Sequence, residues 1–275
     1  MNIFRCIAAV ATILVAAIAP AQADEPAQTL AIDATTTAVS PGAVYGPWNW
    51  LAGSFRTTLG NDKPGLQIIT RSDRDAGAPS SGTSFMLDDY HQFSSHAYGY
   101  ASLQFASGSI FPTRGAYGEI DAAVVDGLAF GAGGGVLANP NETTQRYLSL
   151  GPTLYFHHAN ATLRYLPLWT QNDMGASSWL ASATFGDEGR ASTTFTLQDG
   201  VAPASAANIA LLAPGASERA FAAGITTRHF FRPDLGYDLG LDYAVVNDRS
   251  SGAFLYRSVG VTVGVVWARP ARVSK

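Results

Sequence analysis

The last apolar segment of the chain, Ser258–Trp267, alternates with a strict period of two residues. Its large members, separated by small or polar residues, are Val259, Val261, Val263, Val265 and Trp267. Successive side chains of a strand point to opposite faces, so this segment has one apolar face and one small or polar face. The preceding segment, Asp234–Val246, repeats the pattern with aspartates opposite leucines and tyrosines. Such faces predict a membrane barrel with lipid outside and water inside.

Composition supports a barrel rather than a bundle of membrane helices. The chain is 47% hydrophobic, and 14% of its residues are charged, against about 25% in a typical soluble domain. After the N-terminal region, no stretch reaches the length of a spanning helix without Gly, Pro or charge. The net charge of -4 comes without a clustered basic surface, which excludes nucleic acid as an expected partner.

The N-terminus has the pattern of a secretory signal peptide. Arg5 precedes the apolar stretch Ile7–Ala19, which is followed by the small-residue triplet Ala21–Ala23. We expect residues 1–23 to be cleaved, so that the exported chain begins at Asp24. The alternative, an uncleaved anchor, needs roughly 20 apolar residues, more than this stretch has. Cys6 is the only cysteine, so the exported protein is expected to contain none.

The exported chain is predicted to be an all-β, antiparallel, up-and-down transmembrane barrel. Residues 24–47 show neither the two-residue period of a strand nor the period of a helix. We therefore expect a flexible N-terminal segment, with a plug of the lumen as the alternative. Thirteen candidate strands follow between residues 48 and 267, and residues 268–275 form a short C-terminal tail. Single-chain bacterial barrels have an even number of strands. About twelve strands are therefore expected, with ten and fourteen kept open, and Leu66–Ser72 is the weakest candidate.

Connection lengths predict an orientation, because barrels of this class have short periplasmic turns and longer external loops. The expected external loops are residues 71–82, 107–115, 139–141 and 199–217. The expected periplasmic turns are residues 93–96, 158–160 and 232–233, with a further turn at Gly127.

Charged residues on the polar faces are candidates for the lining of the lumen. The candidate residues are Glu119, Asp121, Arg164, Arg228, Asp238 and Asp242. One interpretation is a network of ion pairs that fills a narrow barrel. The other is a polar passage in which these charges select the solute.

Two further patterns predict local structure rather than chemistry. The glycines of residues 131–135 are expected to make space in a strand beside a bulky lumen side chain. Tyr and Trp residues near strand ends are expected to form girdles at the membrane boundaries. The girdle candidates are Trp48, Trp50, Tyr155, Trp169, Trp179 and Trp267.

An enzyme acting on lipid acyl groups is the alternative from another functional class. It requires a nucleophile, a base and an orienting acid, and the histidines, such as His91 beside Asp89, provide candidates for the base. None of them lies in a recognisable nucleophile motif. His157 and His158 are adjacent, so on a strand they would point to opposite faces and could not share a metal ion. We therefore assign no catalytic, metal or cofactor site.

Several short motifs resemble those of the YaiO-type outer-membrane β-barrel family. They are the aromatic strand His96–Ala101, the pairs Phe111–Pro112 and Gly118–Glu119, and the late run Arg228–Phe231. The resemblance covers about Trp48 to Trp267. The chain departs from the family in two respects. Residues 24–47 are too few for the helical-repeat domain of some members, and a short tail follows Trp267.

The resemblance implies a porin-like barrel in the bacterial outer membrane, with some relatives linked to surface polysaccharide. We therefore expect a non-enzymatic cell-envelope protein. It is either a narrow passage for a polar solute or glycan, or a closed structural or surface barrel. The expected partners are outer-membrane lipids, the barrel-assembly machinery and envelope polysaccharide components.

Overall fold

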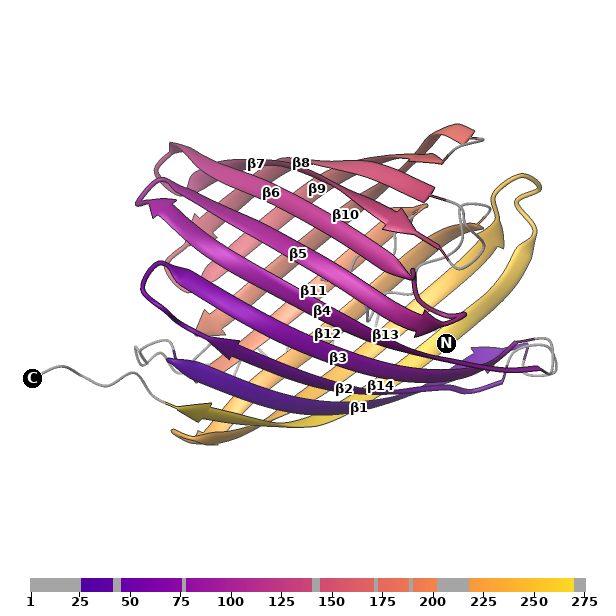
Figure 1. The fold of residues 1–275 in the computed structure, drawn as a ribbon, viewed down its shortest axis with the longest axis horizontal. Helices are drawn as coiled ribbons and strands as arrows, with labels where there is room; N and C mark the ends of the chain where they lie inside the picture. The colour runs from indigo at the N-terminus through magenta and orange to yellow at the C-terminus, as the bar shows by residue number, and fades with distance from the viewer. Residues whose placement is uncertain are drawn as a thin grey trace, which may run out of the picture.

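The chain folds into a closed antiparallel barrel in which consecutive strands pair and the first strand pairs with the last (Figure 1). The computed structural model describes residues 26–41, 46–75, 78–139, 144–170, 173–187, 190–201 and 218–269. The predicted signal peptide, residues 1–23, lies outside these ranges. The described residues contain no helix long and apolar enough to cross a membrane.

The barrel has fourteen strands rather than about twelve. They are β1 (Gln28–Ser40), β2 (Trp48–Thr57), β3 (Asp62–Asp75), β4 (Ala78–Ser94), β5 (Ala97–Gly108), β6 (Arg114–Val125), β7 (Leu128–Ala138), β8 (Thr144–Phe156), β9 (Ala159–Thr170), β10 (Asp173–Asp187), β11 (Ala191–Gly200), β12 (Glu218–Arg232), β13 (Leu235–Asp248) and β14 (Phe254–Arg269). The shortest strands have 10 residues and the longest has 17. About 9 to 11 residues suffice for a tilted strand to cross a bilayer.

The extra strand is β1, which lies in the segment expected to be flexible. It pairs with β14 from Gln28↔Arg269 to Ser40↔Arg257 and with β2 on its other edge, and so closes the barrel. The prediction of a flexible segment was wrong for these residues. Small side chains on the outer face of β1, such as Ala34 and Ala38, weaken the apolar alternation. The β-branched run Thr35–Thr37 nevertheless favours a strand.

The two ends of the barrel differ in their connections. At one end, the turn end, the connections are short and comprise residues 58–61, 95–96, 126–127, 157–158, 188–190 and 233–234. At the other, the loop end, they comprise residues 41–47, 76–77, 109–113, 139–143, 171–172, 201–217 and 249–253. The predicted turns fall at the turn end, and the predicted loops at residues 71–82 and 107–115 fall at the loop end. Most of the other two predicted loops, residues 140–141 and 202–217, lies outside the described residues. The connection predicted at residues 71–82 is wrong in extent, because β3 and β4 continue as a hairpin to Asp75 and Ala78.

The outer face of the barrel is apolar across its middle. On β13, Leu239 and Leu241 are about half exposed, whereas Asp238 between Tyr237 and Leu239 is 4% exposed. The same alternation runs along β14, where Val261 and Val263 face outward. Exposed leucines and valines in a continuous band are favourable only against lipid. The alternation predicted for these two strands is confirmed.

Candidate functional site

All six predicted lumen residues lie on inward faces, but they form separate groups rather than one site. Arg164 on β9 reaches over two strands to Glu119 and Asp121 on β6. Arg228 on β12 pairs with Asp238 on the adjacent strand β13. Asp242, also on β13, shares the inward face with Asp238 and lies over Gly224.

The Arg164 group is a buried charged network. Arg164 Nη2 donates to Asp121 Oδ1 at 2.7 Å and to Glu119 Oε1 at 2.8 Å, and Nη1 donates to the carbonyl oxygens of Gly151 and Pro152 at 2.9 and 3.0 Å. Glu119 also accepts hydrogen bonds from Ser149 Oγ at 2.7 Å and from the Tyr117 hydroxyl. The Arg164 side chain is 7% exposed. Two carboxylates and two carbonyl oxygens thus compensate one buried guanidinium.

The glycines of β7 make room for this network. A Cβ atom at Gly131 would lie 2.5 Å from Arg164 Nη2 and 2.6 Å from Asp121 Oδ1. A Cβ atom at Gly135 would lie 2.6 Å from the Tyr147 ring, which stacks on Tyr117 with centroids 5.7 Å apart. The expected role of the glycine run, space beside a bulky lumen side chain, therefore holds at both positions.

Gly131→Ala is expected to destabilise the barrel, because its methyl group must displace the ion pair of Arg164 and Asp121. Overpacking of this kind typically costs about 1–3 kcal/mol, which urea unfolding of the protein in lipid vesicles measures directly. The matched control is Gly53→Ala, since a Cβ atom there meets nothing within 4 Å. Equal unfolding midpoints for the two variants would contradict this account of Gly131.

A second group of charges lines the opposite part of the lumen. Arg228 binds Asp238 in a bidentate manner, Nε to Oδ1 at 2.8 Å and Nη2 to Oδ2 at 2.7 Å. Arg56 on β2 binds both oxygens of Asp88 on β4 at 2.8 Å, and its guanidinium lies 4.9 Å from the centroid of the Tyr90 ring. The sequence reasoning missed Arg56 and Asp88. Their inward positions within two predicted strands were the signal that could have identified them.

These charges surround a cavity in the half of the lumen nearest the turn end. The cavity has a volume of about 430 Å³, and its lining includes Arg56, Asp88, Thr194, Arg228 and Asp238, from strands on opposite sides of the barrel. A second cavity of about 980 Å³ opens among the β2–β3, β4–β5 and β6–β7 turns. Arg56 and Tyr90 line both cavities. The turn-end half of the lumen therefore holds two cavities with polar linings, beside a small apolar cluster of Ala31, Phe230, Val266 and Ala268.

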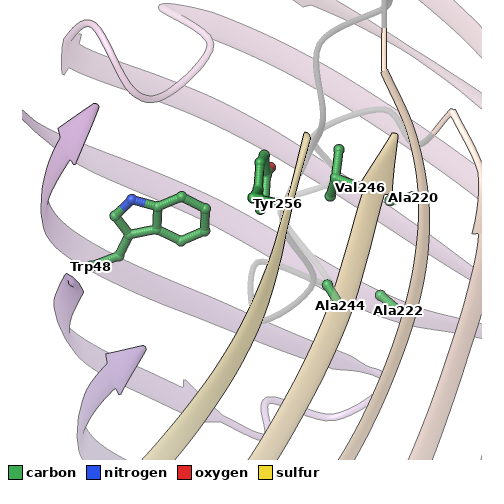
Figure 2. Packing of buried hydrophobic residues seen from close by; sticks show 6 residues of the cluster. All are labelled: Trp48, Ala220, Ala222, Ala244, Val246 and Tyr256. Carbon is green, nitrogen blue, oxygen red and sulfur yellow. The ribbon is translucent and has the colours of Figure 1, made fainter. Parts of the chain in front are cut away.

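The loop-end half of the lumen is filled mainly by apolar side chains, with the ion pair of Arg71 and Asp73 and the buried Gln145 and Gln198 among them. Trp48 and Tyr256 meet edge to face with ring centroids 5.3 Å apart, beside Val246 and alanines of β12 and β13 (Figure 2). A second cluster contains Leu137, Tyr147, Leu166, Leu168, Ala176 and Val201. A third contains Ala52, Ile69 and Phe111, the last from the β5–β6 loop. We call these three clusters the apolar layer.

The prediction of aromatic girdles is wrong for some of its residues, which lie inside the barrel. Trp48 is 3% exposed and lies inside the barrel, where the guanidinium of Arg71 is 5.1 Å from its ring centroid. Trp50 also lies near Arg71, and the hydroxyl of Tyr155 hydrogen-bonds that of Tyr98 across the lumen. Trp179 and Trp267 are 50% and 43% exposed on the outer face, as expected of girdle residues.

The histidines pair with different acids from those considered in the sequence. His91 Nδ1 lies 2.5 Å from Asp62 rather than beside Asp89, and His158 Nδ1 lies 3.0 Å from Asp187. His96 contacts Ser95 Oγ at 2.8 Å in the exposed β4–β5 turn. Among the described residues, no three His, Cys, Asp or Glu side chains are grouped as metal ligands.

Comparison with solved structures identifies the same architecture. The CymD monoaromatic hydrocarbon channel is 9% identical with a TM-score of 0.56, and 90% of each chain is covered. A deletion mutant of the TodX monoaromatic hydrocarbon channel is 10% identical with a TM-score of 0.52, and 91% of each chain is covered. An anion-selective porin from Comamonas acidovorans is 11% identical with a TM-score of 0.45, covering 89% of this chain and 99% of the porin.

A search of curated protein sequences gives no match. The model of one protein family, the YaiO membrane beta barrel domain, matches residues 27–205. This match covers more than half of the chain and begins where β1 begins, and the closed antiparallel barrel agrees with it. The chain belongs to the YaiO membrane β-barrel family.

Proposed function

We propose that this protein is a non-enzymatic passage for a polar solute or glycan across the bacterial outer membrane, closed at the loop end by the apolar layer. The observation that carries the proposal is the division of the lumen. A hollow half, whose cavity is lined by Arg56, Asp88, Arg228 and Asp238, adjoins a half filled mainly by aromatic and aliphatic side chains. Apolar constrictions in channels block ions by excluding water.

Family membership and the connections support this location and orientation. Barrels of this class cross the outer membrane with short turns in the periplasm and longer loops outside. The turn end would then face the periplasm and open the hollow half of the lumen to it. The barrel-assembly machinery and outer-membrane lipids are the partners that this location requires, and envelope polysaccharide components are proposed as further partners.

The test is the single-channel conductance of refolded protein in a planar bilayer, on material whose gel mobility shifts on boiling. The wild type should be closed for most of a recording, and discrete steps that depend on salt concentration are the expected result for a variant that lacks part of the apolar layer. Silence of the wild type, together with silence of a variant that lacks part of the apolar layer, would contradict a passage. That result would favour a closed structural barrel instead.

The charges of the hollow half should set the ion selectivity. Replacing both arginines, as Arg56→Gln/Arg228→Gln, leaves the lumen more negative, so the reversal potential in a salt gradient should move toward that of the cation. Arg219→Gln is the control, because Arg219 is exposed on the outer face and pairs with Asp199 there. A reversal potential that is the same in both variants would exclude these residues from the ion path.

A further inference from the structure

Four arginines encircle the outer face at the loop end. Arg74 on β3, Arg114 on β6, Arg146 on β8 and Arg257 on β14 are all exposed. Their outward direction follows from their neighbours: Arg257 lies between buried Tyr256 and Ser258, and Arg146 between buried Gln145 and Tyr147. No acidic side chain in the described part of the chain forms an ion pair with any of the four. A fifth arginine at this end, Arg219, pairs with Asp199.

The outer face at the turn end carries both signs of charge, and its exposed arginines include Arg232 and Arg269. Its acidic residues include Asp62, which contacts His91, and Asp234, which pairs with Arg232 at 3.6 Å. Acidic partners thus accompany part of the turn-end charge, whereas the four guanidinium groups at the loop-end boundary of the apolar band are available to an anion.

Polarity is graded along the outer face below Arg74, whereas valines lie directly below Arg257. On β3, the outward side chains run from Arg74 through Ser72 and Thr70 to Ile68 and Leu66. On the neighbouring strands, Thr36 donates to Asn49 at 2.8 Å, and the Thr70 and Thr83 hydroxyls lie 3.2 Å apart. The order is charge at the loop end, then hydroxyl and amide groups, then an aliphatic surface.

The aliphatic part of this face is hollowed into a groove. The groove has a volume of about 640 Å³, and its lining includes Ala34, Leu51, Val261 and Val263, with Thr36, Asn49, Thr70 and Ser72 at its polar side. The side chain of Ala34 on β1 is smaller than those of its neighbours and so leaves space between them. Arg74 and Arg257 lie on the two outer strands of this region, β3 and β14.

We propose that this groove binds a phosphorylated lipid of the outer leaflet, with its phosphate groups on Arg74 and Arg257 and an acyl chain along Val261 and Val263. Guanidinium groups bind phosphate oxygens in pairs, and the hydroxyl groups below Arg74 suit the sugar or ester part of the lipid. The assignment of this lipid to the outer leaflet rests on the orientation proposed above, whereas the binding site itself does not depend on that orientation.

The test is a titration of the refolded barrel in detergent with lipid A, a glycolipid with two phosphates, followed by native mass spectrometry. Arg74→Gln/Arg257→Gln should bind about ten-fold or more weakly, since a hydrogen bond to a charged group contributes at least this much. The matched control at the turn end, Arg232→Gln/Arg269→Gln, should bind as the wild type does. The two variants should bind dephosphorylated lipid A with equal affinity.

Equal affinity of the loop-end variant and the wild type would overturn the site, as would equal binding of both lipids by the wild type. A dimer of the barrel that is lost in the loop-end variant, without any effect on lipid binding, would also overturn it and identify a second copy as the occupant. Gel mobility before and after boiling confirms that each variant is folded. A barrel that binds lipid A but conducts no ions, even when part of the apolar layer has been removed, would contradict the proposed passage and leave the lipid site standing.

Discussion

Arg164→Ala should destabilise the barrel by about 3–5 kcal/mol, the usual cost of removing one partner from a buried ion pair. The substitution leaves Glu119 and Asp121 facing one another without a cation, and their side chains are 12% and 3% exposed. It also removes the donor to the carbonyl oxygens of Gly151 and Pro152. Urea unfolding in lipid vesicles, followed by tryptophan fluorescence, measures the loss.

Arg219→Ala is the matched control, because it removes the same side chain from an ion pair whose members are 61% and 48% exposed. Such pairs contribute about 0–1 kcal/mol. A triple variant, Arg164→Ala/Glu119→Gln/Asp121→Asn, should recover part of the stability, since it removes the unpaired charges as well. If Arg164→Ala unfolds at the same urea concentration as Arg219→Ala, the network has no structural role.

The parts of the barrel that could be predicted from the sequence are those in which one face is strongly apolar. In β13 and β14, aspartate or glycine alternates with leucine, tyrosine or valine, and this contrast predicts both the strand and its inward face. The inward positions of Arg164 and Arg228 follow from the same period. Their partners do not, because alternation gives the face of a residue and not the neighbour that it meets across the barrel.

The features that could not be predicted depend on contacts between distant strands. β1 has small and β-branched residues on both faces, and only its pairing with β14 and β2 identifies it as a strand. Trp48 lies near a strand end and so was expected at the membrane boundary, whereas its pleat position and Tyr256 place it inside. The number of residues between a tryptophan and the nearest turn predicts its position along the barrel axis. It does not predict whether the side chain points inward or outward.

The apolar layer has the most direct consequence for function, and removing its aromatic pair should open the lumen. Trp48→Ala/Tyr256→Ala deletes the two largest side chains of the cluster in Figure 2. Water should then enter the loop-end half from the cavity below, and we expect roughly a ten-fold rise in mean conductance, because a dewetted constriction excludes ions almost completely. The measurement is single-channel recording on protein whose folding is verified by gel mobility.

Trp179→Ala is the control for the aromatic pair, since Trp179 is 50% exposed on the outer face and its loss leaves the lumen unchanged. It should retain the conductance of the wild type. An open lumen in the double variant, combined with selectivity that responds to Arg56 and Arg228, would place the constriction and the selecting charges in series along one path. A double variant that conducts no better than Trp179→Ala would mean that the clusters around Leu168 and Phe111 close the lumen without Trp48 and Tyr256.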